Sequence, residues 1–220
     1  MKKNYLKVFF LLFIAFGVST WTGCGNSSTN GVGSDSEVAD NDDREDAEDE
    51  VDEEDIIAEK VADMTGDFEG DVYITEKGGF NIQFPGTPEV TMDMVATEVG
   101  DIELYSYLYE ISRAEAYMVA FGDYPDEFVD EDDPYTLLMS ARDGAFEDMD
   151  PIYERENQIQ INGYPALRTY AIGQTDNMYI VYETALVNNR LFQIMMAKEA
   201  EYPAAEMVSS FLDSFEITMD

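Results

Sequence analysis

Histidine is absent from this chain of 220 residues, and cysteine and tryptophan occur once each, as Cys24 and Trp21. Without histidine, Ser-His-Asp triads, histidine metal sites and imidazole general bases are excluded. With one cysteine, the chain can form neither an internal disulfide nor a zinc site made of several thiolates. There is also no G-x-S-x-G motif and no P-loop. Carboxylate pairs are the one common acid–base chemistry left, so we expect no enzyme, no catalytic residues, no cofactor and no metal centre.

Basic residues are scarce as well, with 12 Lys and Arg against 48 Asp and Glu, and the formal net charge is −36. Nucleic acid is excluded as a partner, because phosphate binding depends on Lys and Arg that release counterions. Two explanations of the acidity stay open: a salt-adapted organism, or a device that keeps the protein soluble. In either case we expect at most weak binding of divalent cations by the acidic residues.

The N-terminal residues have the layout of an export signal. Lys2, Lys3 and Lys7 precede an apolar run from Val8 to Val18, which is too short for a transmembrane helix of about 20 residues. Trp21-Thr22-Gly23-Cys24 resembles the lipobox of bacterial lipoproteins. The resemblance implies cleavage after Gly23, lipidation of Cys24 and anchoring to a membrane. The alternative is a secreted protein without lipid, in which Cys24 is incidental.

Composition then divides the chain at about residue 70. Residues 1–23 are the expected lipoprotein signal peptide, and residues 24–70 hold 18 acids and two basic residues. Such a segment buries too little apolar surface to fold, so we expect Cys24 to be followed by a disordered, acidic tether. Ile57, Val61 and Met64 lie at helical spacing, and they predict either a helix that frays or a short turn that docks on the domain. Residues 71–220 are the expected globular domain.

Strand patterns dominate this domain. Residues 80–84 alternate between apolar and polar side chains before Pro85. Residues 102–111 place Leu104 and Leu108 on one face and three tyrosines on the other, and residues 116–121 are apolar on both faces. Asn162-Gly163 and Asn188-Asn189 each stand between two strand patterns, which predicts two hairpins and a mainly antiparallel sheet.

Two helices are predicted to cover this sheet. One begins at Asp133-Pro134, which supplies an N-cap and a proline at the first helical position. The other begins at Pro203 and has an apolar stripe that runs to Phe215, before a last short strand over residues 216–219. Because a sheet with two apolar faces needs cover on both, the expected fold class is α+β, an α/β/α sandwich around a mainly antiparallel sheet.

Several turns and core positions of the domain form a recognisable set: Gly79-Phe80, Phe84-Pro85, Gly163-Tyr164-Pro165, Asn188-Asn189-Arg190-Leu191-Phe192 and Phe211-Leu212-Asp213-Ser214-Phe215-Glu216-Ile217. At these positions the chain resembles the PsbP-like family. The resemblance implies an α/β/α sandwich and, in bacteria, lipoproteins of unknown role. It implies no ligand residue, because fold alone does not confer activity.

Two local features allow a functional interpretation beside a structural one. The acidic loop at residues 123–133 offers hard oxygen ligands for calcium, although it matches no EF-hand, and its acids also suit the start of a helix. Tyr105, Tyr107 and Tyr109 share one face of a strand. With Arg168 as a nearby cation they form a ligand- or partner-binding surface, or else the tyrosines alone are part of the core under a helix.

From these features we expect a lipid-anchored, extracytoplasmic lipoprotein of the bacterial cell envelope. Its expected role is that of a non-catalytic binding or accessory module for an envelope protein or complex. Two alternatives stay open: an envelope enzyme that depends on a carboxylate pair, and a cation-binding spacer without a specific partner.

Overall fold

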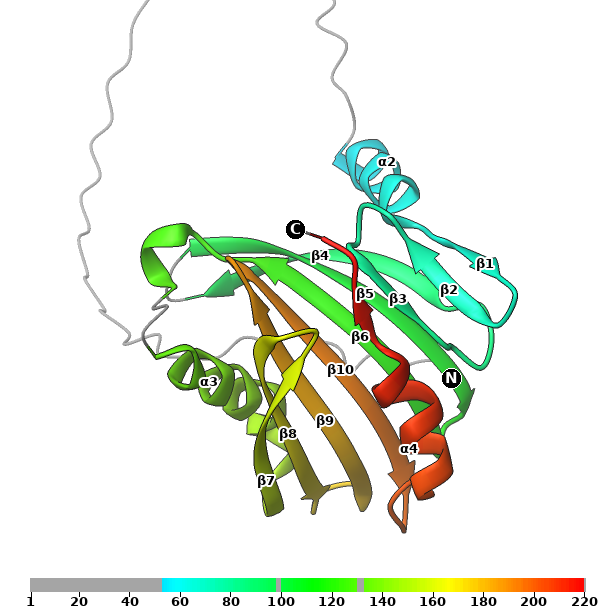
Figure 1. The fold of residues 1–220 in the computed structure, drawn as a ribbon, viewed down its shortest axis with the longest axis vertical. Helices are drawn as coiled ribbons and strands as arrows, with labels where there is room; N and C mark the ends of the chain where they lie inside the picture. Colours follow the sequence, from blue (N-terminus) through cyan, green and yellow to red (C-terminus); the bar gives the residue numbers. More distant parts are fainter. Residues whose placement is uncertain (1–52, 98–99, 130–132, 220) are drawn as a thin grey trace, which may run out of the picture.

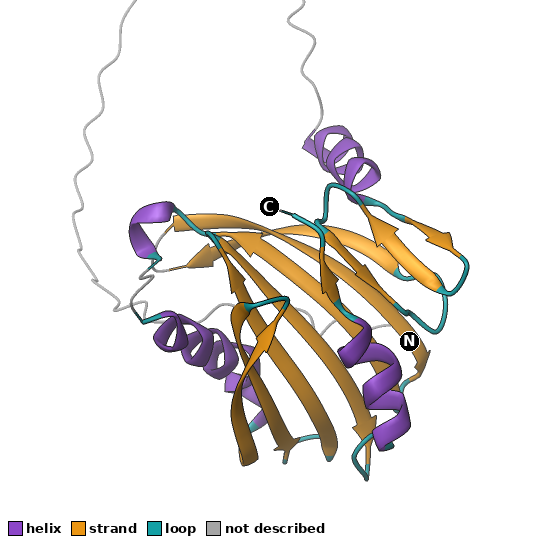
Figure 2. Cartoon of the chain, viewed as in Figure 1, coloured by secondary structure: helices purple, strands orange, loops and turns teal. Residues whose placement is uncertain are grey.

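A computed structural model describes residues 53–97, 100–129 and 133–219. Its centre is a seven-stranded antiparallel sheet in the order β4-β5-β6-β10-β9-β8-β7 (Figures 1 and 2). The strands are β4 (Glu89–Thr97), β5 (Gly100–Ser112), β6 (Glu115–Asp123), β7 (Pro151–Ile161), β8 (Tyr164–Gly173), β9 (Met178–Val187) and β10 (Arg190–Glu199). The prediction of a mainly antiparallel sheet flanked by helices is confirmed.

A second sheet has four short strands in the order β1-β2-β3-β11. They are β1 (Asp67–Glu69), β2 (Val72–Thr75), β3 (Phe80–Ile82) and β11 (Glu216–Ile217). The strand predicted at residues 80–84 therefore ends at Ile82, and the one predicted at residues 216–219 ends at Ile217. β11 pairs with β3, with Ile217 opposite Phe80, so the end of the domain is held by a strand near its beginning.

Three α-helices accompany the sheets: α2 (Glu53–Met64), α3 (Pro134–Phe146) and α4 (Ala205–Phe211). Three short 3-10 helices lie at η1 (Asp126–Phe128), η2 (Glu147–Met149) and η3 (Leu212–Ser214). The helix predicted from Pro203 is thus shorter than expected and gives way to η3. No helix among the described residues is long and apolar enough to cross a membrane.

The two faces of the large sheet bury separate cores, because neighbouring residues of a strand point to opposite faces. On one face, Val181 of β9 belongs to the same apolar cluster as Phe211 of α4 and Phe80 of the small sheet. On the other face, Ile180 of β9 packs with Phe146 of α3. α3 lies against β8 and β9. The large sheet is therefore covered by α4 and the small sheet on one side and by α3 on the other.

Local turn chemistry explains the hairpins. Asn162 and Gly163 both have positive φ, at 51° and 89°, as a two-residue turn of type I′ requires. At the turn between β9 and β10 only Asn188 has positive φ, at 53°. Both predicted hairpins are present, and the second uses a different turn from the first.

The segment just before the domain corrects part of the tether prediction. Residues 53–70 contain α2 and β1, and Val61 and Met64 pack against the core of the α4 side. The Met64 carbonyl accepts hydrogen bonds from Tyr107 Oη at 2.8 Å and Thr75 Oγ1 at 2.9 Å. These contacts from distant strands supply the stability that an isolated short helix lacks. The described fold begins at Glu53, and the predicted signal peptide and Cys24 lie outside the described residues.

Candidate functional site

The three tyrosines of β5 do not form an exposed platform. Tyr105 is 6% exposed and Tyr107 is 0% exposed, while Tyr109 is partly buried against the same core. The Tyr107 ring meets Phe80 edge to face with centroids 5.0 Å apart. Burial raises the pKa of Tyr107, and burial with the hydrogen bond to Glu103 raises that of Tyr105 to about 12. The tyrosines serve the core: Tyr107 packs against Phe80 of the small sheet, and its hydroxyl donates to the Met64 carbonyl at the end of α2.

Arg168 does not join the tyrosines. In the strand register, Tyr107 of β5 lies opposite Val119, Val119 opposite Ile194, Ile194 opposite Glu183, and Glu183 opposite Arg168 of β8. β6, β10 and β9 lie between β5 and β8, so the two strands are four strand spacings apart, or roughly 19 Å. The predicted surface of Tyr105, Tyr107, Tyr109 and Arg168 is therefore wrong as one contiguous site.

The acidic loop shows structural uses where it is described. Asp133 precedes α3, with Pro134 at its first turn, and Asp133 Oδ2 accepts a hydrogen bond from Thr136 Oγ1 at 2.6 Å. Asp130, Glu131 and Asp132 lie outside the described residues. Within the described ranges, no group of three or more acidic, histidine or cysteine side chains is placed to hold a metal ion. Weak cation binding by the acidic surface stays a prediction.

Arg168 instead occupies the centre of a charged bridge that the sequence did not reveal. Arg168 Nε donates to Glu183 Oε1 across the β8–β9 pair, and Arg168 Nη2 donates to Asp213 Oδ1 of η3 at 2.5 Å. Ser209 of α4 donates to the other Asp213 oxygen at 2.9 Å. The Arg168 bridge, made of Arg168, Glu183 and Asp213, therefore ties the large sheet to its C-terminal cover.

The carboxylate of Glu183 lies in an environment that opposes its charge. The side chain is 1% exposed, and its Oε2 atom has no hydrogen-bond partner in the described part of the chain. Burial raises the pKa of Glu183, Arg168 offsets part of this rise, and Asp213 adds to it, so that the pKa reaches about 7. Burial also raises the pKa of Asp213, but the hydrogen bonds from Arg168 and Ser209 leave it below its usual value. Glu183 can thus gain or lose a proton near neutral pH.

A signal for Glu183 does exist in the sequence. It is the only charged residue in the run MYIVYETALV, which forms β9 and is buried at nearly every position. A lone carboxylate in a strand covered on both faces requires a partner. The identity of that partner depends on the register between β8 and β9, which the sequence pattern leaves open.

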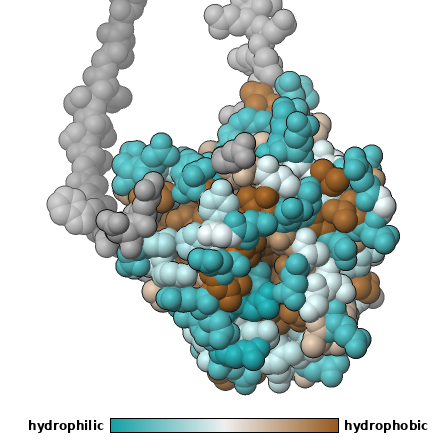
Figure 3. Space-filling view, in the orientation of Figure 1, coloured by the Kyte–Doolittle hydropathy of each residue, from teal (hydrophilic) through white to brown (hydrophobic). Residues whose placement is uncertain are grey.

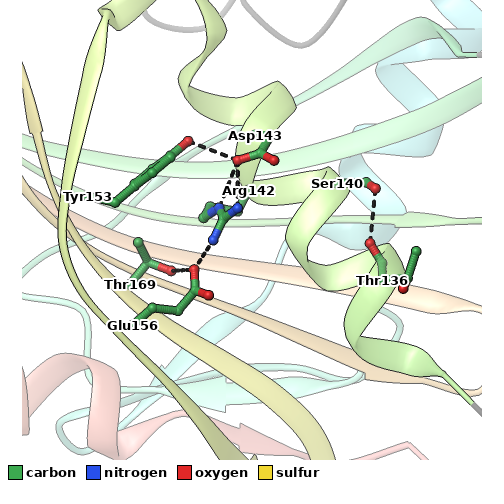
Figure 4. Close-up of polar contacts among 7 residues, drawn as sticks. All are labelled: Thr136, Ser140, Arg142, Asp143, Tyr153, Glu156 and Thr169. Atoms are coloured by element: carbon green, nitrogen blue, oxygen red, sulfur yellow. Dashed lines mark hydrogen bonds and ion pairs between the residues drawn. The ribbon is translucent and has the colours of Figure 1, made fainter.

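A second polar cluster lies on the opposite face, between α3 and β7 (Figure 4). Arg142 of α3 pairs with its neighbour Asp143 and with Glu156 of β7, and its guanidinium lies 4.5 Å from the Tyr153 ring centroid. Tyr153 Oη donates to Asp143 at 3.1 Å, and Thr169 Oγ1 lies 3.4 Å from Glu156. One guanidinium faces two carboxylates here, so the cluster is no site for an anion and instead anchors α3 to the sheet edge.

A third charged contact joins the two sheets. Arg190, at the start of β10, makes two hydrogen bonds to Asp123 at 2.6 and 2.7 Å, and its Nη1 donates to the Gly78 carbonyl at 3.1 Å. Its guanidinium also stacks 4.3 Å from the Phe121 ring centroid. Lysine cannot reproduce a forked donor that stacks on a ring.

We therefore expect Arg190→Lys to lower the free energy of unfolding by about 1–2 kcal/mol, the range of charge-assisted hydrogen bonds. Urea denaturation followed by far-UV circular dichroism measures this change. Arg113→Lys is the matched control, because Arg113 is exposed in the turn after β5. An unchanged urea midpoint for Arg190→Lys would show that the forked contact does not stabilise the fold.

The surface around these contacts is mainly hydrophilic. In Figure 3, hydrophobic residues show in separate patches, several of them over the small sheet. Six of the eight Lys and Arg in the described ranges form ion pairs with acids of the same chain: Lys60, Lys77, Arg142, Arg168, Arg190 and Lys198. In the described part of the chain, positive charge is thus largely paired with acids of the same chain.

No family model matches the chain, and no curated protein matches its sequence. Among solved structures, the chain is similar to cyanobacterial PsbP (CyanoP) from Synechocystis sp. PCC 6803, with 14% identity and a TM-score of 0.44 over 66% of this chain and 91% of that one. It is also similar to PA94 from Pseudomonas aeruginosa, a protein of unknown function, with 9% identity and a TM-score of 0.33 over 49% of this chain and 83% of that one.

Proposed function

We propose that this protein is a lipid-anchored, extracytoplasmic binding module of the bacterial cell envelope that acts without catalysis. The N-terminal pattern carries the proposal: Lys2, Lys3 and Lys7, an apolar run of export-signal length, and Cys24 at the end of a lipobox-like sequence. The acylated thiol holds the chain on the membrane, and residues 25–52 connect it to the folded domain.

Metabolic labelling tests the anchor. We expect a radioactive or clickable fatty acid to label the wild-type chain and to recover it with membranes. Cys24→Ser should lose the label completely and move to the soluble fraction, because the thiol is the only acceptor for the diacylglycerol group. Ser19→Ala, in the same leader, is the matched control and should keep the label. An unlabelled wild-type chain would contradict the anchor.

The charge distribution indicates the kind of partner. The domain has few basic side chains, and most of those described are already paired with its own acids. A partner surface of similar sign would be repelled, whereas a basic envelope protein would be attracted at long range. We infer a partner with a basic contact surface, bound by an interaction that weakens as salt screens the charges.

Affinity purification of the intact, detergent-solubilised protein tests this inference. The expected result is one specific envelope protein that is retained at low ionic strength and released by added salt. Recovery of no partner from membranes crosslinked before solubilisation would contradict a binding role and favour a cation-binding spacer. Glu183 does not support the alternative of an enzyme that uses a carboxylate pair, because a side chain that is 1% exposed is inaccessible to a substrate.

A further inference from the structure

The Arg168 bridge connects a buried carboxylate to a segment that covers it. Asp213 lies in η3 and Ser209 in α4, and both belong to the C-terminal cover of the large sheet. Val208 and Phe211 of α4, Leu212 of η3 and the following Phe215 pack in the same core as the strands beneath. Movement of this cover away from the sheet would break the Arg168–Asp213 contact and admit water to Glu183.

Glu183 has few charged neighbours. Arg168 faces it from β8, Asp213 faces it from η3, and Ile194 lies opposite it on β10. Its Oε2 atom is buried and unpaired among the described residues, so one carboxylate oxygen has no donor when the group is ionised. A protonated carboxyl group removes this charge and needs less hydration.

We propose that Glu183 is a proton-binding site that controls the C-terminal cover, which is held closed when Glu183 is protonated and opens more readily when it is ionised. The cover means α4 and η3, residues 205–214. Opening exposes the Glu183 carboxylate to water, which stabilises the charged form. The closed state keeps the carboxyl in its apolar site and therefore prefers the proton. This property of the domain does not depend on the lipid anchor.

The direction of the pH effect follows from linkage. In the closed state the pKa of Glu183 is raised to about 7 from its ordinary 4.5, which it regains when hydrated. The closed state thus binds more protons between these two values, so the equilibrium shifts toward opening as the pH rises through this range. A change in the pKa of Glu183 from 4.5 to about 7 corresponds to a change of about 300-fold in the equilibrium constant for opening over the whole titration.

Hydrogen exchange of the full chain in an uncharged detergent measures this opening. After correction for intrinsic exchange, amides of Ala205–Phe211 and Leu212–Ser214 should show an opening constant that rises by up to about 70-fold from pH 5 to pH 8. Amides in the middle of β6 and β10 should change much less. A flat profile for the cover in the wild-type chain would overturn the proposal.

Three variants separate the proton site from general stability. Glu183→Gln keeps the shape of the side chain without a titratable group, and the rise with pH should disappear. Asp213→Asn weakens the contact between Arg168 and the cover. Amide exchange in the cover should therefore be faster at every pH, and the opening constant should still rise with pH. Glu76→Gln, at an exposed position, should match the wild type. A slope retained in Glu183→Gln would assign the effect to another group.

A direct titration keeps the proposal testable if Glu183→Gln does not fold. Carboxyl-carbon NMR of the wild-type chain should show one glutamate whose midpoint lies near pH 7 and coincides with the change in cover exchange. A spectrum in which every glutamate titrates below pH 6 would overturn the assignment.

Discussion

Replacing Phe80 with alanine is expected to lower the free energy of unfolding by about 3–5 kcal/mol, the range for deletion of a buried phenylalanine ring. Phe80 lies in β3 of the small sheet and is 0% exposed. Its ring contacts four others: Tyr107 of β5 at 5.0 Å, Phe121 of β6 at 6.5 Å, Phe192 of β10 at 6.2 Å and Phe215 after η3 at 5.6 Å. Phe80 belongs to the small sheet and three of these rings belong to strands of the large sheet, so its removal should weaken the contact between the two sheets.

Urea denaturation followed by far-UV circular dichroism measures the loss. Phe128→Ala is the matched control, since Phe128 lies on η1 and is 49% exposed, and it should change stability by no more than about 0.5 kcal/mol. If Phe80→Ala costs less than about 1 kcal/mol, the small sheet does not share the core of the large one.

The parts of the fold that the sequence predicts are those set by local chemistry. Asn162-Gly163 specifies a turn because both residues accept positive φ, and strand alternation on either side then sets the pairing of β7 with β8. Asp133-Pro134 similarly marks the start of α3, which begins at Pro134. In each case the information lies within a few residues of the structure it predicts.

The parts that were missed depend on contacts between distant segments. Docking of α2 was only one of two alternatives, because the few apolar residues of α2, Val61 and Met64 among them, do not decide it. Contacts from distant strands do, such as the hydrogen bond from Tyr107 of β5 to the Met64 carbonyl. The period-2 pattern of Tyr105 and Tyr107 identifies a common face but does not say whether that face is covered. Burial depends on β3 and β11, whose pairing joins the two ends of the domain. The Arg168 bridge likewise needs the register of β8 against β9 and the position of η3.

The largest electrostatic effect is expected from Arg168→Met. Removing one partner of a buried pair leaves an uncompensated charge, so the free energy of unfolding at pH 8 should fall by about 3–5 kcal/mol. The loss should be smaller at pH 5. Without Arg168 the pKa of Glu183 rises further, the folded protein takes up a proton at pH 5, and the buried group is then neutral. Asp213 contributes little to the loss, because its side chain is 47% exposed and can be hydrated.

A double variant distinguishes the loss of the attraction between Arg168 and Glu183 from the cost of leaving the Glu183 carboxylate buried without its partner. Arg168→Met combined with Glu183→Met replaces the pair by apolar side chains of similar length and should recover most of the stability at pH 8, since apolar replacement of buried ion pairs is often neutral or stabilising. Lys77→Met is the matched control, because Lys77 and Asp63 form a pair with both side chains more than half exposed, and its cost should stay below about 1 kcal/mol at either pH. The prediction is wrong if Arg168→Met loses the same stability at pH 5 and pH 8 and the double variant recovers none of it. Arg168 would then act through packing of its aliphatic stem, and the fold would accommodate the charge of Glu183 without it.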